Sequence, residues 1–197
     1  MLYKKIIFSA LLFVLIHSLV VSGQQNGKKN SIIIDDVGTE FTLPPYPKRI
    51  ISLAPNITEI LFYLNAQNRI VGVTENCNYP EKTKLIEKIG GFINPNIEKI
   101  ASLKPDLVIA TVDGNNPQSI KKLNSIGIKV FVTNTVKLDD IPRIISLLGK
   151  ITDSEKKAKK FRKEFYEIIS SYKLIDKTSK SVLFLLDINP LITAGSK

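Results

Sequence analysis

Arg49-Ile50-Ile51-Ser52-Leu53-Ala54-Pro55-Asn56-Ile57-Thr58-Glu59 is the stretch of this chain that decides its fold. The apolar run at residues 50–53 is typical of a buried strand, and the residues after it repeat with a helical period. Asn56, with Glu59 three places later, resembles a capping box and predicts a helix that starts there. The stretch therefore indicates a strand that runs directly into a helix.

The same alternation continues along the chain. Further strands are predicted at residues 70–73, 107–110 and 128–132, and helices at 94–103 and 117–126, the second ending at Gly127. Strands that alternate with helices at this spacing form a parallel sheet, so residues 49–136 are predicted to be a Rossmann-like α/β lobe. The loops after such strands gather at one edge, where a small molecule can bind.

The flanking segments differ from this lobe. Residues 24–48 are predicted to hold a hairpin (31–43) and a proline-rich lead-in, and residues 137–175 to form one long helix. Within that helix, residues 152–155 form a second capping box. The segment 181–197 begins with an apolar strand that has no later partner in the sequence. We therefore expect it either to pair with the existing sheet or to be the first strand of a second, truncated lobe.

Residues 1–23 have the layout of a cleavable signal peptide: Lys4 and Lys5, then an apolar run, then a small residue before a polar segment. The run is short for a membrane anchor. No cysteine stands at the predicted cleavage site, so we expect a periplasmic protein without a lipid anchor. Cys77 is the only cysteine, which excludes an internal disulfide and predicts a small buried side chain rather than a reactive thiol.

Charge and residue types bear on the function. The formal net charge is +10, but the basic residues are densest at 156–163, a run flanked by Glu155 and Glu164, which is typical of a solvated helix face and not of a nucleic-acid site. The only histidine is His17 in the signal segment, and neither common phosphate-binding glycine motif is present. The adjacent pairs Asp35-Asp36 and Asp139-Asp140 are predicted to stabilise a turn and a helix start. An enzyme is disfavoured, and no metal or cofactor is expected.

Binding is the remaining class of function. The loops after the predicted strands offer Pro55, Asn76, Phe92 and Thr111 as candidate ligand contacts, a mixture of aromatic and polar groups suited to a largely apolar ligand. Phe92 could equally serve as a loop anchor. Tyr79 is expected to pack as an anchor, and Asn56 to cap its helix rather than to touch a ligand.

The chain resembles periplasmic substrate-binding proteins of ABC importers for cobalamin, haem and ferric siderophores, most of all the cobalamin binders. The matching segments, in an order and spacing that cover nearly all of residues 49–197, are 49–59, 70–74, 78–80, 96–98, 103–109, 123–130 and 189–195.

This resemblance implies two α/β lobes joined by a long helix, with the ligand held in the cleft between them. It also implies that the protein is a monomer that delivers its ligand to a membrane permease. Glu98 matches the acidic position at which the first lobe docks on that permease, whereas its counterpart in the second lobe would lie beyond residue 197.

Three interpretations of the function follow from these observations. The first is an importer component truncated in its second lobe, with a corrinoid, haem or another iron chelate as the ligand. The second is a stand-alone periplasmic interaction protein that uses Glu98 and the basic helix. The third is an enzyme that uses carboxylates on the same sheet.

Overall fold

Four apolar runs of the sequence form one parallel sheet. The computed structural model describes residues 30–172, 184–188 and 191–194. The strands are β3 (Ile50–Ser52), β4 (Ile70–Val73), β5 (Leu107–Thr111) and β6 (Val130–Thr133), in the spatial order β4-β3-β5-β6. Ile50 of the central strand β3 pairs with Ile70 on one side and with Leu107 on the other. The predicted α/β fold with a parallel sheet is confirmed.

Both faces of this sheet are covered, as its continuous apolar strands require. One face packs against α2 (Pro55–Tyr63) and α5 (Asp140–Ile151), and the other against α3 (Ile97–Ser102) and α4 (Pro117–Ser125). Alternate strand residues separate accordingly, because Ile50 and Ile109 belong to the first core and Ile51 and Val108 to the second. Short 3₁₀ turns, η1 (Gln67–Arg69) and η2 (Glu81–Leu85), complete the connections.

The start of α2 differs from the prediction. The N-cap is Ala54, which has no side-chain cap, and Pro55 is the first helical residue. Asn56 lies inside the first turn, where its Oδ1 accepts a hydrogen bond from the Ile57 N–H at 2.9 Å. Proline fits the first helical position because its missing N–H would have no partner there, so the N-cap lies two residues earlier than the predicted cap Asn56.

The predicted hairpin consists of β1 (Ser31–Ile34) and β2 (Glu40–Leu43), paired antiparallel with Ile33 opposite Phe41. It lies against the first core, where the rings of Phe41 and Phe131 are 5.1 Å apart. Its turn runs along the free edge of β6, since the Asp36 N–H donates to the Val132 carbonyl at 2.9 Å. The hairpin therefore covers the outer edge of the sheet.

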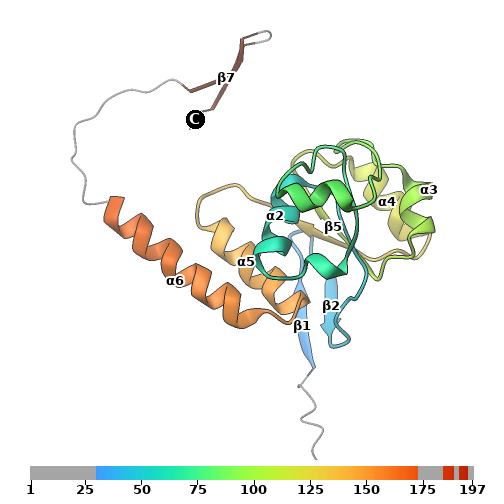
Figure 1. Ribbon diagram of the computed structural model, residues 1–197, viewed down its shortest axis with the longest axis horizontal. Coiled ribbons are helices and arrows are strands. Elements are labelled where there is room, and N and C mark those ends of the chain that lie inside the picture. Colours follow the sequence, from blue (N-terminus) through green and yellow to red (C-terminus); the bar gives the residue numbers. More distant parts are fainter. Residues whose placement is uncertain (1–29, 173–183, 189–190, 195–197) are drawn as a thin grey trace, which may run out of the picture.

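The helix predicted over 137–175 is two helices, α5 and α6 (Glu155–Tyr172), which lie side by side (Figure 1). The break is at Asp153, whose φ of 56° is left-handed and ends a helix. The predicted capping box is not formed by Thr152, because its hydroxyl donates to the Leu148 carbonyl of the preceding helix. The pattern indicated helix correctly but could not show that α6 folds back beside α5.

The last described elements are β7 (Phe184–Ile188) and β8 (Leu191–Ala194), which pair antiparallel with Ile188 opposite Leu191. The expectation that the strand after residue 181 lacks a later partner is therefore wrong. The predicted signal segment, residues 1–23, lies outside the described residues. No helix in the described part of the chain combines the length and the hydrophobicity needed to cross a membrane.

Candidate functional site

The carboxyl edge of the sheet carries all four predicted ligand contacts. Pro55 follows β3 and is half-buried, Asn76 lies in the loop after β4 and is exposed, and Phe92 lies half-buried in the loop before α3. Thr111 ends β5 and is only 4% exposed. The sheet thus brings these residues to one rim, and it places Thr111 beneath the surface of that rim.

A residue that the sequence analysis did not single out connects them. Asn115 is 3% exposed, and its Oδ1 accepts the Thr111 N–H at 2.8 Å. Its Nδ2 donates to the Leu53 carbonyl at 3.1 Å and to the Phe92 carbonyl at 2.7 Å. One buried amide therefore ties together the end of β3, the end of β5 and the loop that carries Phe92.

The backbone N–H of Phe92 is hydrogen-bonded as well as its carbonyl. Its N–H donates to Oδ1 of Asn76 at 3.1 Å. The ring lies directly over Gly114, since a Cβ built on that glycine would be 2.0 Å from the nearest ring carbon. Of the two roles left open for Phe92, loop anchoring is therefore evident, and the half-buried ring still has an exposed part.

The loop that carries Asn76 is fixed from below. Lys88 donates from its ammonium to the Cys77 carbonyl at 2.7 Å. The Cys77 side chain is fully buried, as predicted, and its sulfur accepts a hydrogen bond from the Thr58 hydroxyl at 3.2 Å. Asn76 is thus presented from a loop that is anchored at the next residue, Cys77.

A cavity of about 630 Å³ lies beside this rim, between α2, the loop after β4 and the α5–α6 pair. Tyr79 borders it and is 67% exposed, so the prediction that Tyr79 packs as an anchor is wrong. Asn56 borders the same cavity. The other lining residues are mostly aromatic or aliphatic: Glu59, Ile60, Phe62, Tyr63, Pro80, Thr135, Ile141, Ile144, Ile145 and Phe161.

A second cavity, of about 740 Å³, lies under the hairpin at the opposite edge of the sheet. Its walls include Lys48, Asp106 and Lys129, which precede strands β3, β5 and β6. None of the four predicted contacts borders it, and none of them borders the 630 Å³ cavity either. The 630 Å³ cavity lies next to the rim only through neighbouring residues such as Asn56, whereas the 740 Å³ cavity has no such neighbour of the candidate site among its lining residues.

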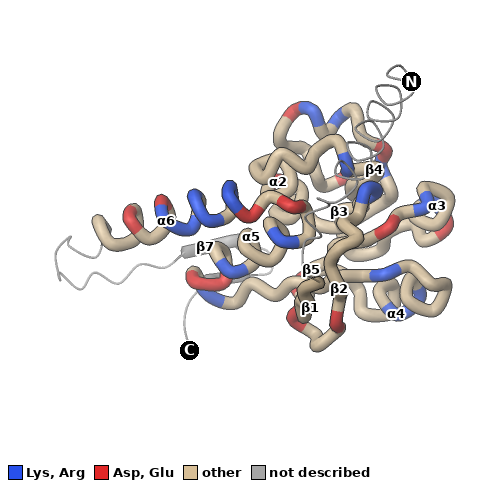
Figure 2. Tube along the Cα trace, turned by 90° about the horizontal axis from the view of Figure 1, so that it is seen from below, with Lys and Arg blue, Asp and Glu red and all other residues tan. Residues whose placement is uncertain are grey.

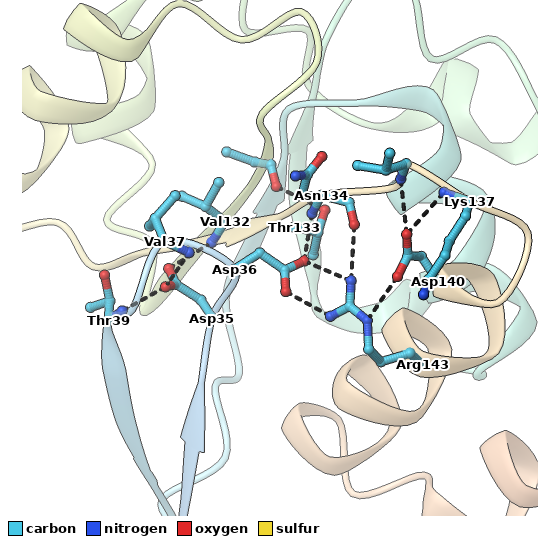
Figure 3. A network of polar contacts seen from close by, with 12 residues as sticks. Asp35, Asp36, Val37, Thr39, Val132, Thr133, Asn134, Lys137, Asp140 and Arg143 are labelled. Atoms are coloured by element: carbon cyan, nitrogen blue, oxygen red, sulfur yellow. Dashed lines mark hydrogen bonds and ion pairs between the residues drawn. The ribbon is translucent and has the colours of Figure 1, made fainter. Parts of the chain in front are cut away.

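Asp35, Asp36 and Asp140 have structural roles in the turn and at the helix start, and the first two also join distant segments (Figure 3). Asp139 stands at the N-cap of α5 but makes no side-chain capping hydrogen bond, so its predicted role is not seen. Asp35 accepts from the N–H groups of its own turn, and Asp36 forms a bidentate pair with Arg143 at 2.6 and 3.1 Å. Arg143 also donates to Asp140 at 3.2 Å, and its pKa is raised chiefly by the hydrogen bond to Asp36. The pKa of Asp140 is lowered, first by the Lys137 N–H and then by the Val136 N–H.

Glu98 and most charged residues of α6 are exposed. Glu98 lies in the first turn of α3, a helix that Asn96 caps by accepting the Lys99 N–H at 2.9 Å. Figure 2 shows lysines and glutamates interleaved along α6, where Lys160–Glu164 and Lys163–Glu167 approach within 3.6 and 3.7 Å. Within the described residues, no three or more His, Cys, Asp or Glu side chains gather closely enough to hold a metal ion.

Comparison with known proteins gives a consistent result. A family model described as periplasmic binding protein matches residues 50–177. An uncharacterized ABC transporter substrate-binding lipoprotein of Bacillus subtilis, YvrC, is 35% identical over 162 residues, which cover 78% of this chain and 51% of that protein. A vitamin B12-binding protein of Vibrio parahaemolyticus is 31% identical over 76% of this chain and 55% of its own length.

The crystal structure of the periplasmic vitamin B12-binding protein BtuF of Vibrio cholerae matches with a TM-score of 0.68 at 31% identity. The match covers 75% of this chain and 58% of that one. This chain thus spans about half the length of the curated relatives it matches.

Proposed function

The chain belongs to the periplasmic binding protein family, and on that premise we propose that it is the substrate-binding component of an ABC importer, capturing a corrinoid such as cobalamin outside the cytoplasm. The observation that carries this proposal is the rim at the carboxyl edge of the sheet. There Asn115 joins three loops and holds Phe92 in place beside the exposed Asn76. Ligands bind at this edge of open α/β sheets.

The chemistry of the rim supports a large, mostly apolar ligand with polar substituents. The ring of Phe92 and the exposed ring of Tyr79 offer apolar contact, and the amides of Asn76 and Asn56 offer hydrogen bonds. A corrinoid has this character, with a flat macrocycle surrounded by amide groups. Haem and ferric siderophores present carboxylate or catecholate oxygens instead, and the loops of the described rim, residues 53–59, 74–80, 91–94 and 111–115, contain no arginine to pair with them.

The remaining steps of transport complete the proposal. The described lobe supplies one wall of an interlobe cleft, and Glu98, exposed at the start of α3, faces the permease during delivery. The protein acts in the periplasm as a monomer and carries out no chemical step. Because a single wall covers only one side of a ligand, we expect weak binding by the lobe alone.

A nuclear magnetic resonance titration detects binding even when it is weak. We expect millimolar cyanocobalamin to shift the amide signals of residues 74–80 and 91–94, and Phe92→Ala to reduce these shifts. Phe165→Ala is the matched control, because Phe165 lies on α6, outside the rim. Haemin and a ferric siderophore are the comparison ligands. Unchanged rim signals with all three ligands would contradict the proposed binding function.

A further inference from the structure

We propose that Asn115 and Gly114 are positioning residues that set the place of Phe92 in the ligand-binding rim before any ligand arrives. This inference rests on the proposed function, since it concerns the same rim. It adds two residues that never need to touch the ligand. Their role follows from three observations, on the hydrogen bonds of the Phe92 backbone, on the side chain of Asn115 and on the packing of the Phe92 ring against Gly114.

The first observation is that the backbone of Phe92 is fixed on both sides. Its N–H donates to Asn76 at 3.1 Å, and its carbonyl accepts from Asn115 at 2.7 Å. A loop residue whose two backbone groups are both satisfied by side chains has little freedom to shift along the rim. Phe92 thus has a defined height relative to the sheet, although it lies outside any helix or strand.

The second observation is that only an asparagine side chain satisfies the position of Asn115. The site requires one acceptor for the Thr111 N–H and two donors, for the carbonyls of Leu53 and Phe92. A carboxamide supplies both kinds of group from adjacent atoms. A carboxylate of the same shape would accept from Thr111 but would face two carbonyl oxygens with no proton to donate.

The third observation is the contact between the Phe92 ring and Gly114. This glycine has a φ of +104°, and a Cβ there would lie 2.0 Å from Cε1 and 2.2 Å from Cζ of the ring. Any other residue would therefore push the ring away in addition to straining the turn. The Phe92 ring packs directly on Gly114, and the next residue, Asn115, donates to the Phe92 carbonyl.

The consequence is that the Phe92 ring is already in position for contact with a ligand before the ligand binds. The ordering cost of the Phe92 loop is met during folding, so a ligand that uses the ring does not have to order the loop when it binds. We expect the rim to accept ligands that offer a flat apolar surface at this height. Loss of either positioning residue should loosen the ring without removing any group that touches the ligand.

Fluorescence can test this inference without a ligand. The chain contains no tryptophan, so Phe92→Trp introduces a single tryptophan at the ring position, which can be excited selectively at wavelengths that the tyrosines do not absorb. In this background we expect Asn115→Ala and Gly114→Ala to shift the emission to longer wavelength and to increase quenching by acrylamide. Asn116→Ala is the matched control, because Asn116 caps α4 by accepting the Gln118 N–H and should leave the emission unchanged.

Asn115→Asp gives a readout that general loss of stability would not reproduce. At neutral pH the buried carboxylate faces two carbonyls, so the emission should resemble that of Asn115→Ala. At acidic pH the protonated carboxyl can donate to one of them, and the emission should move back toward that of the parent. The Asn115→Ala protein should show no such recovery, and circular dichroism confirms folding of each variant across the pH range.

The outcomes separate the two proposals. Unchanged emission from the introduced fluorophore in Asn115→Ala and Gly114→Ala, in folded protein, would overturn the positioning role. Equal changes in Asn116→Ala would overturn it too, because the effect would then be general to the loop. If the emission changes as expected while wild-type protein shows no rim shifts with cyanocobalamin, the positioning role stands and the proposed ligand class fails.

Discussion

Asp35 offers the most direct test of how this lobe is held together. The residue is 5% exposed, and its Oδ1 accepts the N–H groups of Val37 at 3.1 Å and Thr39 at 2.6 Å. Its Oδ2 accepts the N–H of Val132, 97 residues away on β6, at 3.0 Å. One carboxylate thus closes the hairpin turn and attaches it to the free edge of the sheet (Figure 3).

The expected cost of Asp35→Asn follows from these three bonds. An asparagine oxygen can still accept from Val37 and Thr39, but its NH₂ group then faces the Val132 N–H, so a donor meets a donor. A hydrogen bond to a charged group contributes about 1.5–3 kcal/mol, and we expect the free energy of unfolding to fall by about this amount. Asp35→Ala leaves all three N–H groups without the carboxylate, and should cost about 3–5 kcal/mol because water replaces only part of the loss.

Urea denaturation followed by circular dichroism measures the free energy, and amide hydrogen exchange at Val132 shows whether the loss is local. Asp113→Asn is the matched control, since Asp113 is an exposed aspartate in the loop after β5. We expect faster exchange at Val132 in both Asp35 variants and a smaller change in the control. If Asp35→Asn were as stable as Asp113→Asn, the attachment of the hairpin through this carboxylate would be refuted.

Three further predictions concern other parts of the lobe. Gly149→Ala should lower the midpoint of thermal unfolding, because the new Cβ would lie 2.6 Å from the Cβ of Ala158 and overpacking of this kind costs about 1–3 kcal/mol. Lys150→Ala, on the exposed side of α5, is the control. The pKa of Asp140 is lowered in the folded state, so the ionised carboxylate stabilises the fold at pH values above the ordinary value of 3.8, and this stabilisation is lost as the pH falls below that value. In Asp140→Asn we therefore expect the free energy of unfolding, measured by urea denaturation, to depend less steeply on pH in this range. Cys77, which is fully buried, should react with a thiol reagent only as fast as the lobe opens, and a labelling rate independent of urea would contradict this burial.

The sequence was most informative where one apolar period dominates. Residues 107–111 are one such run, buried along its whole length, and such a run has few alternatives to a central strand. The helices at residues 97–102 and 117–125 lie within the ranges predicted from the sequence, although the capping side chains of Asn96 and Asn116 were not predicted. These strands and helices depend on residues close in sequence, which is why pattern alone identified them.

Features that depend on distant partners could not be predicted in the same way. The bonds of Asn115 reach residues 62 and 23 positions away, so its role is visible only once the sheet has assembled. The one local signal was an asparagine after Asp113-Gly114, which indicates a turn and nothing more. The exposure of Tyr79 and the reversal of the chain between α5 and α6 likewise follow from tertiary packing, which a helical period does not specify.

Polar side chains at two borders of this sheet have the same role, which is to form hydrogen bonds with backbone groups that no strand pairs with. Where a strand ends or lies at the border, its N–H and C=O groups have no neighbouring strand to pair with. At the border strand β6, Asp35 and Asp36 accept the N–H groups of Val132 and Asn134. At the ends of β3 and β5, Asn115 serves the Leu53 carbonyl and the Thr111 N–H. Because these partners come from loops, satisfying the sheet also fixes the loops, and a rim that is set in this way can present Phe92 at a constant position.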